Sequence, residues 1–177
     1  MNLWLRVIAV IVSTFFRPKL PFGGPSVLTF RVWPHDLDIN VHMNNARYMA
    51  LMDLGRLDLI VRCGLWRTVF RQAWQPVIAA SLVRFKKPLK PFQPFTLTSR
   101  VLGWDERWIY IEHVIATDEA VACHAVVRGA FVKKGAVIPP EQVAAAADMS
   151  DPSPSLPEWL PAWREADRAF DTVSSMT

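Results

Sequence analysis

The segment Trp33–Arg56 constrains the fold of this chain more than any other. Before it, apolar residues alternate over residues 26–32, which predicts a half-buried strand. Its second half has apolar residues at helical spacing, which predicts a long helix from about Asn45 to Cys63 that ends at Gly64. The loop between these two elements carries six polar side chains: Asp36, Asp38, Asn40, His42, Asn44 and Asn45.

Asp38, Asn40 and His42 alternate with two apolar residues, Ile39 and Val41. In an extended segment, this alternation would place the carboxylate, the amide and the imidazole on one side. They would then lie at the start of a helix, where free backbone N–H groups and the helix dipole stabilise negative charge. A base or nucleophile beside an oxyanion site is what acyl transfer requires. The alternative, in which these residues only form a loop and cap the helix, stays open.

The motif D-x-D-x-N-x-H-M-N-N-x-x-Y, at residues 36–48, resembles the hotdog-fold acyl-CoA thioesterase superfamily, which includes the 4-hydroxybenzoyl-CoA thioesterase type. The chain is most similar to the thioesterase-superfamily-member-six type, which shares R-C-G at residues 62–64 and L-G-W-D-x-R at residues 102–107. The resemblance covers roughly residues 26–133. It implies an α+β hotdog fold, in which an antiparallel five-stranded sheet wraps around a long central helix.

The resemblance also implies a set of active-site residues. Asp38 matches the catalytic carboxylate of the 4-hydroxybenzoyl-CoA type, and Asp38, Asn40 and His42 match active-site residues of plant acyl-carrier-protein thioesterases. Asp53 is the nearest counterpart of a Glu that relatives frequently carry on the helix, which would make it a second catalytic carboxylate near the partner subunit's site, and the alternative is an exposed ion pair with Arg56. Val41 departs from the Gly that many relatives have before the His. We expect these residues to bind substrate: Asn44, Asn45, Tyr48, Met52, Arg84 and Lys86.

These residues predict a thioester hydrolase that acts on fatty-acyl-CoA or acyl carrier protein and needs no cofactor. Asp38 would act as general base or as nucleophile, and backbone N–H groups near residues 44–46 would hold the oxyanion. In this family the acyl chain enters a tunnel between two subunits, which predicts a homodimer, with a tetramer as the alternative. A non-catalytic acyl-binding or membrane-attached protein of lipid metabolism stays open, as does a less favoured hotdog dehydratase or isomerase.

Composition argues against several other classes. The chain has 177 residues, 51% of them hydrophobic, which suits one globular domain with a core. The net charge is +4, but Lys and Arg are scattered apart from Arg84, Lys86 and Lys87, so we expect no nucleic-acid partner. That basic run either meets coenzyme A phosphates or is a solvated strand end. Cys63 and Cys123 are expected to be small buried residues, and no metal site is expected.

The chain divides into a hydrophobic N-terminal segment with a linker at 1–25, a hotdog domain at 26–135 and a C-terminal helical extension at 136–177. After the long helix, strands are expected at about 77–86, 95–103, 107–115 and 120–132. The apolar run within residues 1–16 is shorter than the ~20 residues that span a bilayer. It either lies at a membrane surface or packs on its own domain or its dimer partner. We expect a cytoplasmic protein, with membrane association as the open question.

Overall fold

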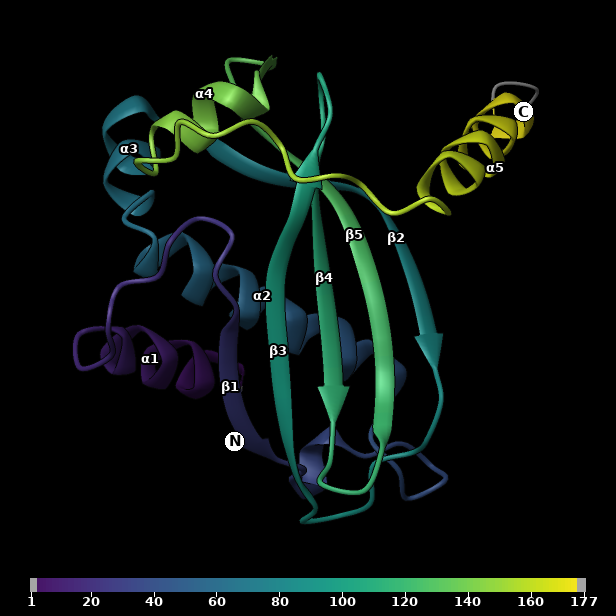
Figure 1. Cartoon of the computed structure of the whole chain (residues 1–177). Helices are drawn as coiled ribbons and strands as arrows, with labels where there is room; N and C mark the ends of the chain where they lie inside the picture. Colours follow the sequence, from purple (N-terminus) through teal and green to yellow (C-terminus); the bar gives the residue numbers. More distant parts are fainter. Residues whose placement is uncertain (1–2, 175–177) are drawn as a thin grey trace.

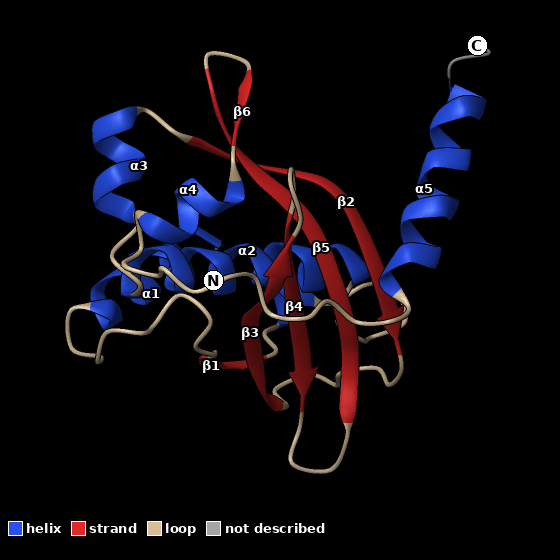
Figure 2. Cartoon of the chain, turned by 45° about the horizontal axis from the view of Figure 1, so that its top comes forward, coloured by secondary structure: helices blue, strands red, loops and turns tan. Residues whose placement is uncertain are grey.

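The computed structural model describes residues 3–174 as one curved sheet, a long helix that the sheet curls around, and shorter helices outside them (Figures 1 and 2). In chain order the elements are α1 (Leu3–Thr14), β1 (Ser26–Arg31), the 3-10 helix η1 (Pro34–Asp36), α2 (Asn45–Arg62), α3 (Trp66–Gln72), β2 (Gln75–Phe85), β3 (Pro94–Trp104), β4 (Ile109–Ala116), β5 (Val121–Lys133), β6 (Ala136–Ile138), α4 (Pro140–Ala145) and α5 (Leu160–Ser174).

The sheet is antiparallel throughout, with the strand order β1-β3-β4-β5-β2 and with β6 paired to β5. One early strand, a long helix and four further strands around that helix confirm the expected α+β hotdog arrangement. β6 pairs with the end of β5 from Lys133 opposite Ala136 to Phe131 opposite Ile138, so the sheet continues past residue 135. β2 lies at one edge, where β5 is its partner.

The central helix α2 has the bounds that its sequence signals predict. Asn44 caps its start, because the side-chain oxygen Oδ1 accepts a hydrogen bond from the backbone N–H of Ala46 at 2.8 Å. At the other end the backbone N–H of Cys63 donates to Leu59, and Gly64 follows with a φ of +82°. Glycine adopts this left-handed conformation without steric cost, which explains why the helix stops there.

The middle of α2 lies unusually close to β3. A Cβ atom on Gly55 would overlap Oγ of Ser99 and would lie 3.2 Å from Cδ2 of Leu97. This close packing on the sheet explains why a glycine stands inside the helix. The helix buries one side between the strands, and its fully buried side chains include Leu51 and Met52. This burial of apolar surface holds α2 in the sheet.

The remaining helices lie outside this central unit. α1 packs against α2, and α3 follows α2 directly in the chain. Both α1 and α3 lie on the same side of the molecule (Figures 1 and 2). α4 packs on β5, and α5 projects at the opposite side (Figure 1). Within residues 3–174, no helix combines the length and the apolar character that crossing a bilayer would need.

Candidate functional site

The segment between η1 and α2 is a tight turn and not the extended segment that we expected. The backbone N–H of Asp38 donates to the carbonyl of His42 at 2.9 Å, and the N–H of Val41 donates to the carbonyl of Asp38 at 3.1 Å. Oδ1 of Asp38 accepts from the N–H of Asn40 at 2.8 Å and from that of His42 at 3.4 Å. An Asp side chain that bonds nearby backbone N–H groups favours a turn over a strand, so the alternation does not set the side-chain directions here.

Val41 has a backbone conformation that explains the glycine preference at this position. Its φ is +61°, which lies in the left-handed region that a β-branched residue rarely adopts. Its side chain is exposed, as is that of Ile39, which is 97% exposed. The turn therefore presents two apolar side chains to the outside, next to Asp38, Asn40 and His42.

Backbone hydrogen bonds at the start of α2 leave one N–H group pointing out of the helix. The N–H of Asn44 donates to the carbonyl of Asp36 at 2.8 Å, and that of Ala46 donates to Asn44. Among the described residues, no acceptor takes a hydrogen bond from the N–H of Asn45. It is therefore the helix-start donor that an oxyanion could use.

Two of the expected substrate-binding residues lie in the core. Met52 is fully buried, and Tyr48 is 2% exposed and packs edge-on against Phe85, with the ring centroids 5.2 Å apart. Burial raises the pKa of Tyr48 above its ordinary value. Arg84 and Lys86, in contrast, are exposed at the Phe85 end of β2.

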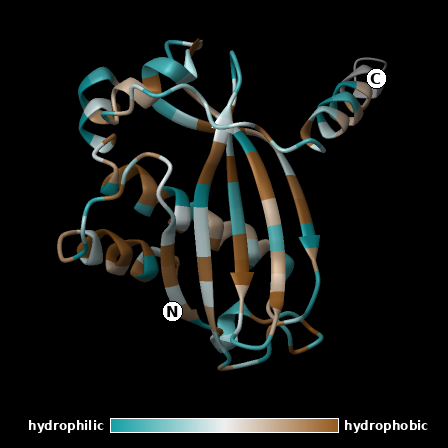
Figure 3. Cartoon of the chain, in the orientation of Figure 1, coloured by the Kyte–Doolittle hydropathy of each residue, from teal (hydrophilic) through white to brown (hydrophobic). Residues whose placement is uncertain are grey.

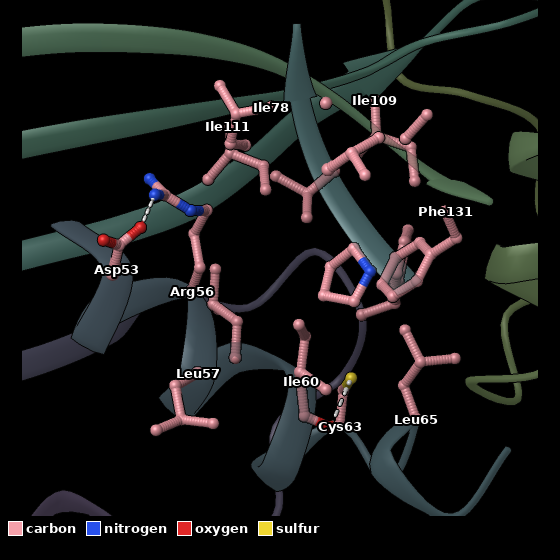
Figure 4. A pocket seen from close by; sticks show the side chains of 17 residues that line it. Asp53, Arg56, Leu57, Ile60, Cys63, Leu65, Ile78, Ile109, Ile111 and Phe131 are labelled. Atoms are coloured by element: carbon pink, nitrogen blue, oxygen red, sulfur yellow. Dashed lines mark hydrogen bonds and ion pairs between the residues drawn. The ribbon is translucent and has the colours of Figure 1, made fainter. Parts of the chain in front are cut away.

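A cavity of about 300 Å³ lies between the second half of α2 and the sheet (Figure 4). Its walls are apolar, and its charged members are Asp53 and Arg56 at one end. These two side chains form the ion pair that their spacing predicted, with Asp53 exposed and Arg56 mostly covered. The other lining residues are Phe22, Leu57, Leu59, Ile60, Cys63, Leu65, Pro76, Val77, Ile78, Val101, Ile109, Ile111, Gly129, Ala130 and Phe131.

Behind Arg56 a buried polar chain continues into the sheet. Nη1 of Arg56 lies 3.2 Å from Nε2 of His113, and Nδ1 of His113 lies 2.8 Å from Oγ of Ser99. Burial, together with the Arg56 guanidinium, lowers the pKa of His113 to about 3. His113 is therefore neutral at physiological pH. Both ring nitrogens of His113 thus have partners, and the pairing with Arg56 could not be identified from the sequence.

The cysteines do not supply a nucleophile. Cys63 lines the cavity, and its thiol donates to the carbonyl of Ile60 at 3.6 Å. Burial raises the pKa of Cys63, and it raises the pKa of the fully buried Cys123 to about 11, so both side chains stay protonated thiols at neutral pH. Among the side chains of residues 3–170, no three His, Cys, Asp or Glu side chains gather in a way that would hold a metal ion.

The Asp38 turn and the cavity lie at opposite ends of β2. The turn is held at the Phe85 end, because Met43 donates its backbone N–H to the carbonyl of Leu89 at 2.9 Å. The cavity reaches Pro76, Val77 and Ile78 at the other end. Within one chain the structure therefore separates the Asp38 turn, with Asn40 and His42, from Asp53.

Comparison with known proteins gives the family context of this site. The family model described as "Thioesterase-like superfamily" matches residues 32–163. The zebrafish (Danio rerio) protein THEM6 is 35% identical over 110 residues, which cover 62% of this chain and 54% of that protein. Thioesterase lcsJ of the fungus Purpureocillium lilacinum is 27% identical over 116 residues, which cover 51% of this chain and 36% of that protein. The matched region is thus less than two thirds of either relative.

A solved structure shows the same fold. The crystal structure of YbaW, a probable thioesterase from Escherichia coli, superposes with a TM-score of 0.64 at 17% identity, covering 70% of this chain and 96% of that one. At this identity the likeness supports the fold alone.

Proposed function

Because the chain belongs to the thioesterase-like superfamily, we propose that it hydrolyses acyl thioesters of coenzyme A or acyl carrier protein, with Asp38 as the carboxylate that acts on water or on the substrate carbonyl. The observation that carries this proposal is the Asp38 turn at the start of α2. The turn carries a carboxylate, an amide and an imidazole in the segment directly before the helix-start N–H of Asn45, in a fold that also has an apolar cavity.

The hydrogen bonds of Asp38 fit a catalytic carboxylate. Oδ1 holds the turn, whereas Oδ2 has no hydrogen-bond partner among the described residues. Oδ2 can therefore take a proton from water, and the resulting hydroxide attacks the thioester carbonyl. In the alternative step, Oδ2 attacks the carbonyl directly and water cleaves the mixed anhydride. In both cases the C–S bond breaks and the thiolate leaves, while the N–H of Asn45 stabilises the oxyanion.

We also propose that the working enzyme is a homodimer. No other described strand pairs with the outer edge of β2, whose residues are mostly exposed, including Val77, Ile78 and Leu82. An unpaired, apolar edge strand favours pairing with a second chain. Antiparallel pairing with a second copy about Ala80, the middle of β2, would place the Phe85 end of one chain beside the Gln75 end of the other.

This pairing would unite the two separated parts of the site. The Asp38 turn lies at the Phe85 end of its own strand, and the cavity opens at the Gln75 end. Each turn would therefore meet the cavity of the second copy, with Asp53 and Arg56 at its rim. The apolar cavity suits an acyl chain. Arg84 and Lys86, exposed near the turn, suit the phosphates of coenzyme A.

The test is hydrolysis of acyl-CoA and acyl carrier protein substrates of several chain lengths by the full chain and by Asp38→Asn. The asparagine keeps an acceptor oxygen for the turn but removes the negative charge. We expect Asp38→Asn to lower kcat by about a thousandfold or more, as for lost general-base catalysis combined with lost charge. The matched control is Asp53→Asn, for which we expect a change below about tenfold.

The remaining outcomes are as informative. Unchanged turnover in Asp38→Asn would overturn the assignment, and loss in Asp53→Asn instead would move the catalytic carboxylate to the cavity rim. Binding of acyl-CoA and of acylated carrier protein without turnover of either would favour a non-catalytic acyl-binding protein. A monomer at catalytic concentrations, measured by light scattering, would contradict the shared site.

A further inference from the structure

The helix α1 presents an apolar face to the outside. Its single charged residue, Arg6, points inward and is 4% exposed. Nη2 of Arg6 lies 2.5 Å from Oδ2 of the buried Asp36, and Nη1 lies 3.2 Å from Oδ1. Figure 3 shows that α1 is mostly hydrophobic. Its outward side carries exposed apolar side chains at helical spacing, and two more follow the helix: Trp4, Leu5, Ile8, Ile11, Val12, Phe15 and Phe16.

The neighbouring helix α3 extends this surface and adds positive charge. Phe70 is 79% exposed and Trp66 is 39% exposed, and each lies next to an arginine, Arg71 and Arg67 respectively. One broad hollow is lined by residues of both helices and of the segment after α1, which places these residues on one surface. We call this surface the α1–α3 face, defined by Trp4, Ile8, Ile11, Phe15, Phe16, Lys19, Trp66, Arg67, Phe70 and Arg71.

The cations of the α1–α3 face are available for an external partner. Among the side chains of residues 3–170, Lys19, Arg67 and Arg71 form no ion pair with a carboxylate, whereas Arg17 is held by the buried Asp58 at 3.2 Å. Two carboxylates, Asp148 and Asp151, also line the hollow, so the cations of the face exceed its anions.

We propose that the α1–α3 face docks on a lipid bilayer that contains anionic phospholipids. Exposed aromatic and aliphatic side chains bordered by Lys and Arg are the pattern of helices that lie in the headgroup region. α1 has 12 residues, which suits a helix on the surface of a bilayer and is short of a span. The sequence predicted membrane contact through residues 1–16, and residues 1–2 of that segment lie outside the described residues.

Charge argues against a second copy of this chain as the occupant. In a symmetric contact both copies present the same surface, on which the three cations Lys19, Arg67 and Arg71 outnumber the two carboxylates, so the net charge of the surface opposes the contact. Phosphate groups of anionic lipids would instead neutralise these cations, while Phe15 and Phe16 enter the acyl boundary.

The α1–α3 face also adjoins the cavity to which we assigned the acyl chain. Phe22, Leu57 and Cys63 line both the hollow of this face and the cavity. A docked chain would therefore hold its cavity next to the bilayer. This consequence, but not the docking itself, rests on the proposed function.

Co-sedimentation with vesicles tests the docking on the full chain. We use vesicles of phosphatidylcholine alone and of phosphatidylcholine with an equal amount of phosphatidylglycerol. We expect the chain to bind the vesicles that contain phosphatidylglycerol, and we expect salt to weaken this binding. The double variant Phe15→Ser/Phe16→Ser should bind these vesicles about tenfold more weakly. The triple variant Lys19→Glu/Arg67→Glu/Arg71→Glu should also bind them about tenfold more weakly. Phe92→Ser is the control, because Phe92 is 53% exposed in the loop between β2 and β3, outside the face, and should leave binding unchanged.

Several results would overturn the proposal. The unaltered chain could fail to bind either kind of vesicle, or the two variants of the α1–α3 face could bind as well as the unaltered chain. Vesicle binding could also fall as much in Phe92→Ser as in those two variants. A change of oligomeric state in Phe15→Ser/Phe16→Ser, without any vesicle binding by the unaltered chain, would assign the face to a second copy. Hydrolysis of a short, water-soluble acyl-CoA is measured in parallel. Vesicle binding by a chain that shows no turnover would sustain the docking and count only against the proposed function.

Discussion

Arg56 and His113 meet through a hydrogen bond whose direction is fixed by their chemistry. A guanidinium has no acceptor, so Nη1 of Arg56 donates to Nε2 of His113 across 3.2 Å. The proton of the neutral ring therefore sits on Nδ1, which donates to Oγ of Ser99 at 2.8 Å. The result is a continuous chain from Asp53 at the cavity rim, through Arg56 and His113, to Ser99 on β3.

The first prediction concerns this buried chain. His113→Leu removes both ring nitrogens and leaves Arg56 and Ser99 short of a partner in a buried place. Since each unsatisfied buried group costs about 1–3 kcal/mol, we expect the free energy of unfolding to fall by about 3 kcal/mol in urea denaturation. The control, His124→Gln, alters a 40% exposed ring paired with Glu112 and should cost about 0.5 kcal/mol. Equal losses in the two variants would contradict the prediction.

The second prediction is a pH dependence of stability. The pKa of His113 falls from its ordinary 6.5 to about 3 on folding, so the unfolded chain binds the proton more tightly. The contribution of neutral His113 to the free energy of unfolding is complete above pH 6.5 and is lost as the pH falls toward 3. Between about pH 6 and pH 4.5 the loss should approach about 1.4 kcal/mol per pH unit.

The variant His113→Leu isolates this dependence, because it removes the titrating ring. The pKa values of Asp105 and Glu112 lie below 3.8 and 4.5 in the folded chain, so these carboxylates contribute at more acidic pH. His35 also has a lowered pKa but is common to both proteins. Unfolding curves of the unaltered chain and of His113→Leu that run parallel between pH 6 and pH 4.5 would refute the assignment.

The third prediction concerns the close approach of α2 and β3. Gly55→Ala would push a methyl group into Oγ of Ser99, and we expect a loss of about 3 kcal/mol in the free energy of unfolding. In a Ser99→Ala background the same change should cost less, since the overlapping oxygen is gone. The coupling is measured with a double-mutant cycle, and a coupling free energy near zero would rule out this contact as the cause.

The fourth prediction concerns the Asp38 turn. Val41→Gly relieves a left-handed conformation that costs a branched residue about 1–2 kcal/mol, partly offset by the greater freedom of glycine in the unfolded chain. We expect a net gain of about 0.5–1 kcal/mol, seen as a higher Tm in calorimetry. Ile39→Gly, in the same turn but without a positive φ, should lower Tm instead. A lower Tm for Val41→Gly would show that the turn tolerates valine without strain.

The order of elements could be predicted because periodicity reports which faces are buried. Helical spacing and Gly64 gave α2 its bounds, and alternating residues located the strands from β2 to β5. The conformation of the Asp38 loop could not be read this way. A local hydrogen bond from the N–H of Asn40 to the Asp38 side chain decides that conformation, and the alternation carries no information about it.

The candidate site was only partly predictable for a different reason. The ion pair of Asp53 and Arg56 follows from their spacing on one helix, so the sequence showed it. The contact of Arg56 with His113 joins residues 57 positions apart, and such a pair depends on how the strands are ordered. Tyr48 and Met52 share a helical stripe that suits either a core or a ligand path, and both are buried in the core.

The inward position of Arg6 sets the rotation of α1 about its own axis. A helix that lies on a domain through apolar contacts alone can turn, because one apolar side chain substitutes for the next. A guanidinium bound to Asp36 by both of its terminal nitrogens, and to the carbonyl of Arg31 at 3.2 Å, has no such substitute. Turning the helix by one residue, about 100°, would expel Arg6 and leave Asp36 buried without its cation. Trp4 and Ile8 are thus oriented outward by an interaction on the opposite side of the same helix, in water as well as at a lipid surface.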